Sequence, residues 1–109
     1  MNALDQTFTA LADPTRRAIL ERLAHGEATV GELAAPFAIS LPAVSRHLKV
    51  LEQASLISNE RRGKHRQCRL IPEKLAGATE WLDFHRRFWT GSLDRLGAHL
   101  KQTAKENKR

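Results

Sequence analysis

The sequence predicts a mainly α-helical domain with one small β-hairpin, and two observations lead to this prediction. Apolar residues recur at helical spacing through most of the 109-residue chain. Between residues 56 and 71 the spacing changes to near alternation around an Arg-Gly-Lys turn, which is typical of a hairpin. A chain of this length holds one core, so we expect one domain over residues 1–101 and a polar tail over 102–109.

The composition indicates a basic globular protein. Hydrophobic residues make up 41% of the chain, and the formal net charge is +6. This excess of positive charge favours a polyanionic partner, which is DNA, RNA or an anionic membrane surface. No apolar run approaches the roughly 20 residues of a membrane-spanning helix, and the N-terminus lacks the pattern of a signal peptide. Cys68 is the single cysteine, which fits a reducing compartment, so we expect a cytoplasmic protein.

Three short helices are expected before residue 40, over residues 3–12, 14–24 and 30–37. Leu4 and Phe8 begin an apolar stripe on the first helix. Asp13, which precedes a proline, is suited to cap the second helix. Thr29 and Glu32 have the spacing of a capping box, so they predict the start of the third helix.

The stretch SLPAVSRHLKVLEQASLI, residues 40–57, predicts a helix over about 41–54 with two different faces. The face expected to be buried repeats at i, i+4 and i+7 and comprises Val44, Leu48 and Leu51. The other face carries Ser45, Arg46, Lys49 and Gln53. Short polar and basic side chains on a helix with an apolar back suit the major groove of DNA, which is about 12 Å wide. This segment is therefore the predicted reading helix.

The hairpin predicted over about 56–71 carries a basic tip opposed only by Glu60. The tip residues are Arg61, Arg62, Lys64, His65 and Arg66. A basic hairpin beside a reading helix is suited to contact backbone phosphates, as a wing does. A last helix is expected over about 73–101. Four helices, a hairpin and a further helix in this order predict a winged helix-turn-helix that binds double-stranded DNA rather than a membrane.

Other functions explain parts of this pattern less well. An ordinary surface helix and a solvated charged loop would account for each element alone, but not for both in this order. RNA binding is less favoured because no aromatic residue lies in the hairpin or on the exposed helix face to stack bases. A non-specific architectural DNA coater is a further alternative. No glycine-rich phosphate loop, nucleophile elbow or useful carboxylate pair is visible, so we expect neither an enzyme nor a cofactor.

Three stretches of the chain resemble the ArsR-type winged-helix transcriptional regulators: LADPTRRAILERL (11–23), TVGELAAPFAISLPAVSRHLKVLEQASLI (29–57) and RRGKHRQCRL (61–70). The resemblance covers the chain from residue 4 to about 100. It implies a cytoplasmic homodimer that represses transcription by covering an operator, with an interface built from the first and last helices. The predicted last helix fits such an interface, because it is too apolar all round to be a surface helix of a monomer. The expected interface residues are Leu4, Phe8, Trp81, Phe84, Phe88, Trp89 and Leu93.

The residues expected to contact DNA lie on the reading helix and the wing. They are Ser40, Leu41, Ser45, Arg46, His47, Lys49, Arg61, Arg62, Lys64 and Arg66. His47 lies at the edge of the buried face, where local packing and donation to a phosphate are both open. A two-fold dimer would place two reading helices about 34 Å apart, which suits an inverted repeat.

Many relatives bind a metal that releases them from DNA, and the sequence departs from both of their usual sites. Thr29 and Gly31 stand where a Cys-x-Cys pair would supply thiolates, and neither residue can replace a soft ligand. Asp83, His85 and His99 lie on the last helix, but their spacing differs from the acidic and histidine pattern of relatives. We therefore expect no metal site. A metal- or redox-responsive regulator that uses Asp83/His85/His99 or Cys68 is the alternative, and the effector is left open.

Overall fold

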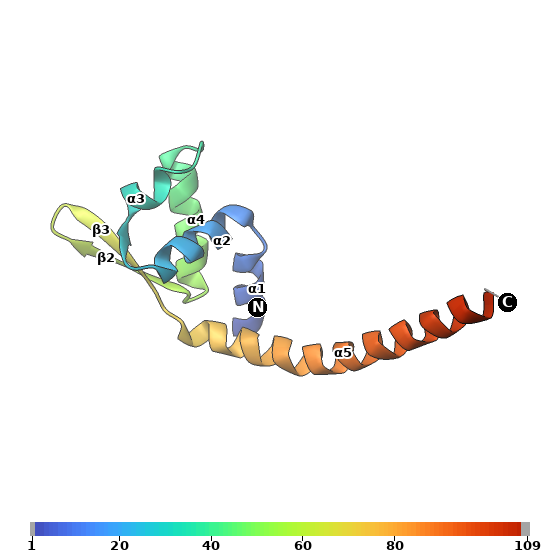
Figure 1. Ribbon diagram of the computed structural model, residues 1–109. Helices are drawn as coiled ribbons and strands as arrows, with labels where there is room; N and C mark the ends of the chain where they lie inside the picture. Colours follow the sequence, from blue (N-terminus) through green and yellow to red (C-terminus); the bar gives the residue numbers. More distant parts are fainter. Residues whose placement is uncertain (1, 108–109) are drawn as a thin grey trace. The chain divides into compact units, whose positions relative to one another are not determined.

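A computed structural model describes the backbone of residues 2–107 and the side chains of residues 2–101. The chain divides into two compact units, residues 1–78 and 79–109. The elements are α1 (Ala3–Leu11), α2 (Pro14–Ala24), β1 (Ala28–Thr29), α3 (Val30–Ala34), α4 (Leu41–Gln53), β2 (Ile57–Arg62), β3 (His65–Leu70) and α5 (Glu73–Asn107) (Figure 1). Four helices, a hairpin and a last helix follow in the predicted order, which confirms the winged helix-turn-helix.

Each of the first four helices begins at a side chain that accepts a hydrogen bond from a backbone N–H of the first turn. These capping residues are Asn2, Asp13, Thr29 and Ser40. At α3 the bond is reciprocal, because Glu32 also accepts from the Thr29 backbone N–H, so the predicted capping box is confirmed. Such caps satisfy amides that have no partner within the helix.

The helix α3 is shorter than predicted and ends at Ala34, not at residue 37. Pro36 explains the difference, because it has no N–H to continue the helical ladder. The Phe37 N–H instead donates to the Ala34 carbonyl in a turn, and its ring packs half-buried against the core. This turn leads to Ser40 at the start of α4.

The helix α4 ends in a left-handed residue that is not glycine. Ser55 has φ 59°, and its N–H donates to the Glu52 carbonyl at 2.9 Å. The Leu56 N–H donates to the Leu51 carbonyl at 3.0 Å, and both leucine side chains are fully buried. This is the hydrogen-bond pattern of a Schellman motif with its apolar contact. The motif turns the chain sharply from α4 into β2.

The sheet has three antiparallel strands in the order β1-β3-β2. The predicted hairpin is present: Arg62 pairs with His65 across a two-residue turn. Gly63, the first turn residue, has φ 61°, as a type II′ turn requires. The sequence did not predict β1, which consists of two residues that pair with Cys68 and Gln67.

One apolar core holds the first unit together. Its largest fully buried side chains include Ile19, Leu33, Val44, Leu48, Leu51, Leu56 and Cys68. The predicted buried face of α4 is therefore confirmed. On α1 the residues buried in this core are Thr7 and Ala10, whereas Leu4 and Phe8, which are expected at a dimer interface, are half-buried. Thr7 occupies the core without an unsatisfied hydroxyl, since its Oγ1 donates to the Ala3 carbonyl at 3.0 Å.

The helix α5 continues without interruption through Gly77, Gly91 and Gly97. It reaches Asn107 and so includes much of the segment predicted as a polar tail. That segment contains Lys, Gln, Ala and Glu, which are good helix formers, and neither Gly nor Pro. None of the helices in the described residues has the length and apolarity to cross a membrane.

Candidate nucleic-acid interface

The helix α4 presents a polar front and is held by its apolar back. Val44 and Leu48 are buried in the core, while Ser45, Arg46 and Lys49 are exposed. Leu41, at the start of the helix, is also exposed. The pattern of exposure is therefore the one expected of a helix that enters a groove of DNA from this side.

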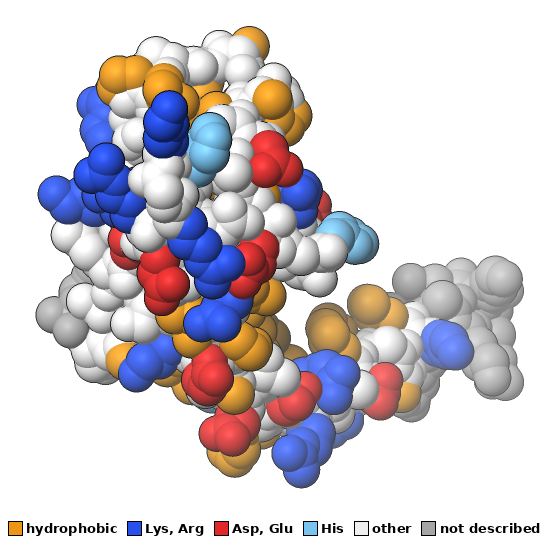
Figure 2. Space-filling view, turned by 90° about the vertical axis from the view of Figure 1, so that its left-hand side faces the viewer, with side chains coloured by type: hydrophobic (Ala, Val, Ile, Leu, Met, Phe, Trp, Pro, Cys, Tyr) orange, Lys and Arg blue, Asp and Glu red, His pale blue; other side chains and the backbone are white. Residues whose placement is uncertain are grey.

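The tip of the β2–β3 hairpin concentrates exposed positive charge. Arg61 lies directly opposite Arg66 in the antiparallel register, and like charges in this arrangement repel. Figure 2 looks onto the side of the molecule that carries the hairpin tip, and Lys and Arg side chains gather there. Arg62 differs from its neighbours, because its Nη1 lies 3.4 Å from Glu27 Oε2 and forms an ion pair. An anionic partner would relieve the repulsion that the other tip residues experience.

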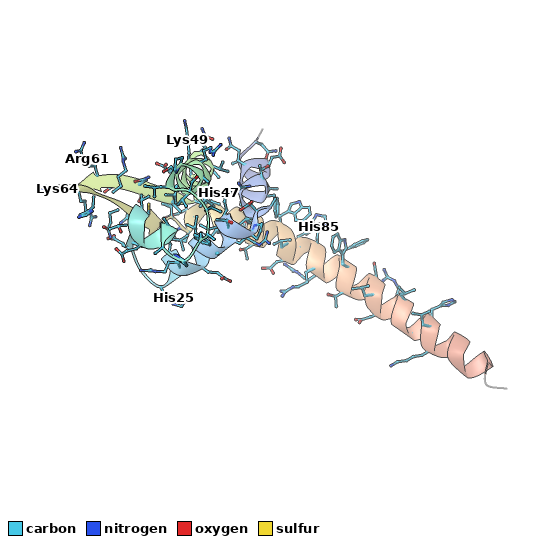
Figure 3. All side chains as sticks on the ribbon, turned by 90° about the horizontal axis from the view of Figure 1, so that it is seen from above. His25, His47, Lys49, Arg61, Lys64 and His85 are labelled. Carbon is cyan, nitrogen blue, oxygen red and sulfur yellow. The ribbon has the colours of Figure 1, made fainter. Side chains whose placement is uncertain are left out.

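A groove of about 750 Å³ joins the front of α4 to the hairpin. We call it the α4–wing groove, and the sequence-predicted residues that line it are Leu41, Ser45, Lys49, Lys64 and Arg66. Figure 3 shows Lys49 on α4, and Arg61 and Lys64 at the free end of the hairpin. Two predicted segments that are distant in sequence thus share one concave surface. Of the other predicted residues, Ser40, Arg46, Arg61 and Arg62 are exposed outside its lining.

The lining of the α4–wing groove also includes polar residues that the sequence did not assign to DNA contact, among them Glu52, Gln53 and Asn59. The sequence predicts Gln53 on the exposed face of α4 and indicates no role for it. Asn59 Oδ1 is a buried acceptor that has no hydrogen-bond partner among the described residues. A signal for Asn59 was present, because it lies two residues after the buried Ile57 and so on the same face of the strand.

His47 is a residue of α4 whose side chain contacts the start of α2, and 22% of this side chain is exposed (Figure 3). Its Nδ1 is 3.3 Å from Arg16 Nη1 and 3.8 Å from Asp13 Oδ2. The Arg16 backbone N–H, which donates to Asp13 Oδ2, lowers the pKa of the Asp13 carboxyl, and the positive charge of the Arg16 guanidinium acts in the same direction. Of the two possibilities that the sequence leaves open for His47, local packing is therefore present, on the Nδ1 side of its ring.

Thr29, Asp83 and His85, three residues at the positions of possible metal ligands, have other contacts in the described structure. Thr29 uses its hydroxyl to cap α3. Asp83 Oδ1 forms an ion pair with Arg86 Nη2 at 3.1 Å, and the His85 ring stacks on Trp81 with centroids 4.1 Å apart. Within residues whose side chains are described, no three His, Cys, Asp or Glu side chains are placed to hold a metal ion.

Cys68 is fully buried on β3. Burial raises the pKa of its thiol to about 11, and the negative charge of Glu52 acts in the same direction. The thiolate is the reactive form of cysteine, so this environment suppresses reactivity. The structure therefore favours an inert strand residue over a redox switch at Cys68.

The residues expected at a dimer interface are accessible in the single chain. Leu4 and Phe8 on α1 are half-buried. The aromatic and leucine side chains of α5 are exposed, with 68% of Phe84, 65% of Phe88 and 58% of Trp89 accessible. Apolar exposure on this scale marks an interaction surface.

Comparison with known proteins places this arrangement in a family. A family model described as a helix-turn-helix domain matches residues 11–59. The HTH-type transcriptional regulator Rv2034 of Mycobacterium tuberculosis is 52% identical over 89 residues, which cover 82% of this chain and 80% of the relative. The arsenical resistance operon repressor of Escherichia coli is 32% identical over 103 residues, covering 94% of this chain and 86% of the relative.

Solved structures agree with these sequence relatives. A crystal structure of an ArsR family transcriptional regulator has a TM-score of 0.75 and 41% identity, covering 81% of this chain and 91% of that one. A homodimeric winged helix-turn-helix DNA-binding domain from Mycobacterium bovis has a TM-score of 0.63 and 26% identity, covering 78% of this chain and 79% of that one. The chain belongs to the ArsR family of winged helix-turn-helix transcriptional regulators.

Proposed function

We propose that this regulator is a homodimeric repressor that binds an inverted repeat in double-stranded DNA through α4 and the β2–β3 hairpin. The α4–wing groove is the observation that carries the proposal. It joins the exposed polar front of one helix to a basic hairpin tip on a single concave surface. A regulator that covers an operator works where the chromosome is, so the proposal includes the cytoplasmic location expected from the sequence.

Within the proposed complex the side chains divide by reach and charge. Ser45 is short and lets the backbone of α4 approach the base edges, while Arg46 and Lys49 extend to bases or phosphates. Ser40 and Leu41 lie at the helix start, which is the part of a reading helix that enters the groove first. Lys64 and Arg66 lie at the hairpin tip and are assigned to phosphates, as is Arg61. Arg62 has to leave or share its ion pair with Glu27 to do the same.

The proposed dimer buries the apolar face of α5 against a second copy, together with Leu4 and Phe8 of α1. Aromatic side chains such as Phe84, Phe88 and Trp89 each bury on the order of 150–250 Å² in an interface. The similar winged helix-turn-helix domain from Mycobacterium bovis is homodimeric, which supports the same assembly here. A two-fold dimer presents two copies of α4, and these fit two half-sites one helical turn apart.

Selection of binding sequences from a random duplex pool, followed by DNase I footprinting, tests the proposal. The expected result is one enriched inverted repeat, protected over a bounded region by two chains per site. Protection that spreads along any DNA without a boundary would instead identify an architectural coater. Absence of DNA binding at low salt would contradict the proposal entirely, because low salt strengthens phosphate contacts.

A further inference from the structure

Arg16 is a residue of α2 whose side chain contacts both α1 and α4. Its Nε donates to the Ala10 carbonyl at 2.8 Å, and its Nη2 donates to the Thr9 carbonyl at 3.0 Å. Both carbonyls belong to the last turn of α1, which has no basic residue of its own. The guanidinium therefore supplies the positive charge that stabilises the carbonyl end of that helix. These two bonds also fix where the third nitrogen of the guanidinium can lie.

That third nitrogen, Arg16 Nη1, lies 3.3 Å from Nδ1 of His47 on α4. A guanidinium only donates hydrogen bonds, so Nδ1 has to accept in this contact. A neutral imidazole that accepts at Nδ1 carries its proton on Nε2. The contact with Arg16 therefore selects the Nε2–H tautomer of His47.

Asp13 does not compete for the ring in this arrangement. Its Oδ2 accepts from the Arg16 backbone N–H at 3.0 Å and is 3.8 Å from His47 Nδ1, beyond hydrogen-bond distance. The two ring nitrogens of a histidine point away from each other, so Nε2–H is directed away from the Arg16–Asp13 side. With 22% of its side chain exposed, His47 is held by packing yet still open to solvent.

We propose that Arg16 is a positioning residue for DNA binding, which holds His47 as the Nε2–H tautomer so that the ring donates a hydrogen bond to a phosphate oxygen. The proposal rests on the proposed function, in which α4 lies against DNA. It joins the two possibilities that the sequence left open for His47, because local packing uses Nδ1 and phosphate donation uses Nε2. It also gives Arg16 a role in binding although Arg16 does not line the α4–wing groove.

The tautomer is tested on the free protein, so this part does not depend on DNA. In histidine-labelled protein at alkaline pH, we expect ¹⁵N NMR to show a pyridine-type shift for His47 Nδ1 and a pyrrole-type shift for Nε2. Arg16→Met should move both signals toward the averaged values of a tautomer mixture. Arg17→Met is the matched control, because Arg17 Nη1 donates to the Leu11 carbonyl at the same end of α1 at 2.7 Å. It should leave the His47 signals unchanged.

Operator affinity tests the second part. In the proposed dimer, which loses one hydrogen bond per chain, His47→Ala and Arg16→Met should each weaken binding about 25-fold, which is about fivefold for each lost hydrogen bond. The double variant should be no weaker than either single variant, since both act on one contact. His47→Gln keeps an N–H donor near the position of Nε2 and should retain affinity, even in the Arg16→Met background. His47→Asn reaches only the Nδ1 position and should bind as weakly as His47→Ala.

The outcomes separate the two proposals. Unchanged His47 signals in Arg16→Met, or wild-type affinity in His47→Asn, would overturn the role of Arg16 and His47. If Arg16→Met does not fold, the Gln and Asn variants decide, because both leave the bonds from Arg16 to α1 in place. A wild-type protein that shows the Nε2–H tautomer but binds no DNA would refute the proposed function and, with it, the role of the tautomer in binding.

Discussion

Cys68 lies opposite Ala28 in the antiparallel register of β3 and β1, and the side chains of both residues are fully enclosed. Burial raises the pKa of the thiol to about 11 from an ordinary value of 9.0. At about pH 8 the thiolate fraction of the folded protein is then lower than that of the unfolded protein by on the order of 100-fold. Native protein should therefore react with a soluble thiol reagent at least about 100-fold more slowly than unfolded protein. Stopped-flow labelling in the absence and presence of denaturant measures the ratio. Similar rates in both states would contradict the enclosure of Cys68.

The same pKa shift predicts how stability depends on pH. A thiol whose pKa is higher in the folded state contributes stability that is fully present below pH 9 and is lost as the pH rises to about 11. The free energy of unfolding should therefore fall by about 2–3 kcal/mol more in wild type than in Cys68→Ala across this window. Urea unfolding of both proteins at several pH values checks the difference. Parallel pH profiles would show that the thiol titrates normally.

The left-handed backbone of Ser55 indicates that a glycine at this position would stabilise the end of α4. Its φ of 59° lies in the left-handed region, which costs a residue with a Cβ roughly 1–2 kcal/mol. Ser55→Gly removes this cost but adds chain entropy to the unfolded state, so we expect a net gain of about 0.5–1 kcal/mol. Ser55→Ala keeps the strain and serves as the control. Thermal unfolding that ranks the alanine variant level with the glycine variant would refute the argument from backbone strain.

Local signals explain how much of the fold could be predicted from the sequence. The starts of α2, α3 and α4 were predicted correctly because Asp13, Thr29 and Ser40 cap helices by bonds within one turn. The buried face of α4 was predicted because a helix repeats every 3.6 residues, which the apolar residues follow. The two residues of β1 were missed because so short an edge strand has no period of its own.

The candidate site was harder to predict where it depends on contacts between distant segments. Asn59 lines the α4–wing groove only because the Schellman turn brings β2 back beside α4. The contact between Arg16 and His47 joins residues 31 apart in the chain, and no local pattern encodes it. The exposed side of α4 was visible in the sequence, but what holds His47 in place was not.

A charge placed on the apolar face of α5 should change the oligomeric state of the protein. Phe88 is 65% exposed in the single chain, and Phe88→Asp would place a charge in the proposed dimer interface. We expect sedimentation equilibrium to show a dimer for wild type and a monomer for this variant, with circular dichroism unchanged. Arg87→Asp places the same charge on the polar side of α5 and should stay dimeric. A dimer of undiminished affinity in Phe88→Asp would move the interface elsewhere.

We expect the β2–β3 hairpin to contribute affinity for duplex DNA whatever its base sequence. Lys64 lines the α4–wing groove at the turn of the hairpin, and the proposal assigns it to a phosphate. Lys64→Ala should weaken binding to operator and random duplex alike, and it should reduce the log–log salt slope by about 0.9 per contact. Titrations at several salt concentrations measure the slope. A loss confined to the operator would instead give Lys64 a base contact.

Arg46 provides the test of the central claim, which is that the exposed front of α4 recognises base sequence. Fluorescence anisotropy titrations should compare wild type, Arg46→Ala and Arg22→Ala on the selected inverted repeat and on a scrambled duplex at one salt concentration. Arg22 is the matched loss of charge, because it lies on α2, outside the proposed reading helix and hairpin, and pairs with Glu32. We predict that Arg46→Ala loses about 1–3 kcal/mol on the repeat and little on the scrambled duplex, so that specificity falls, while Arg22→Ala keeps its specificity. Equal discrimination between the two duplexes by Arg46→Ala and wild type would contradict the claim.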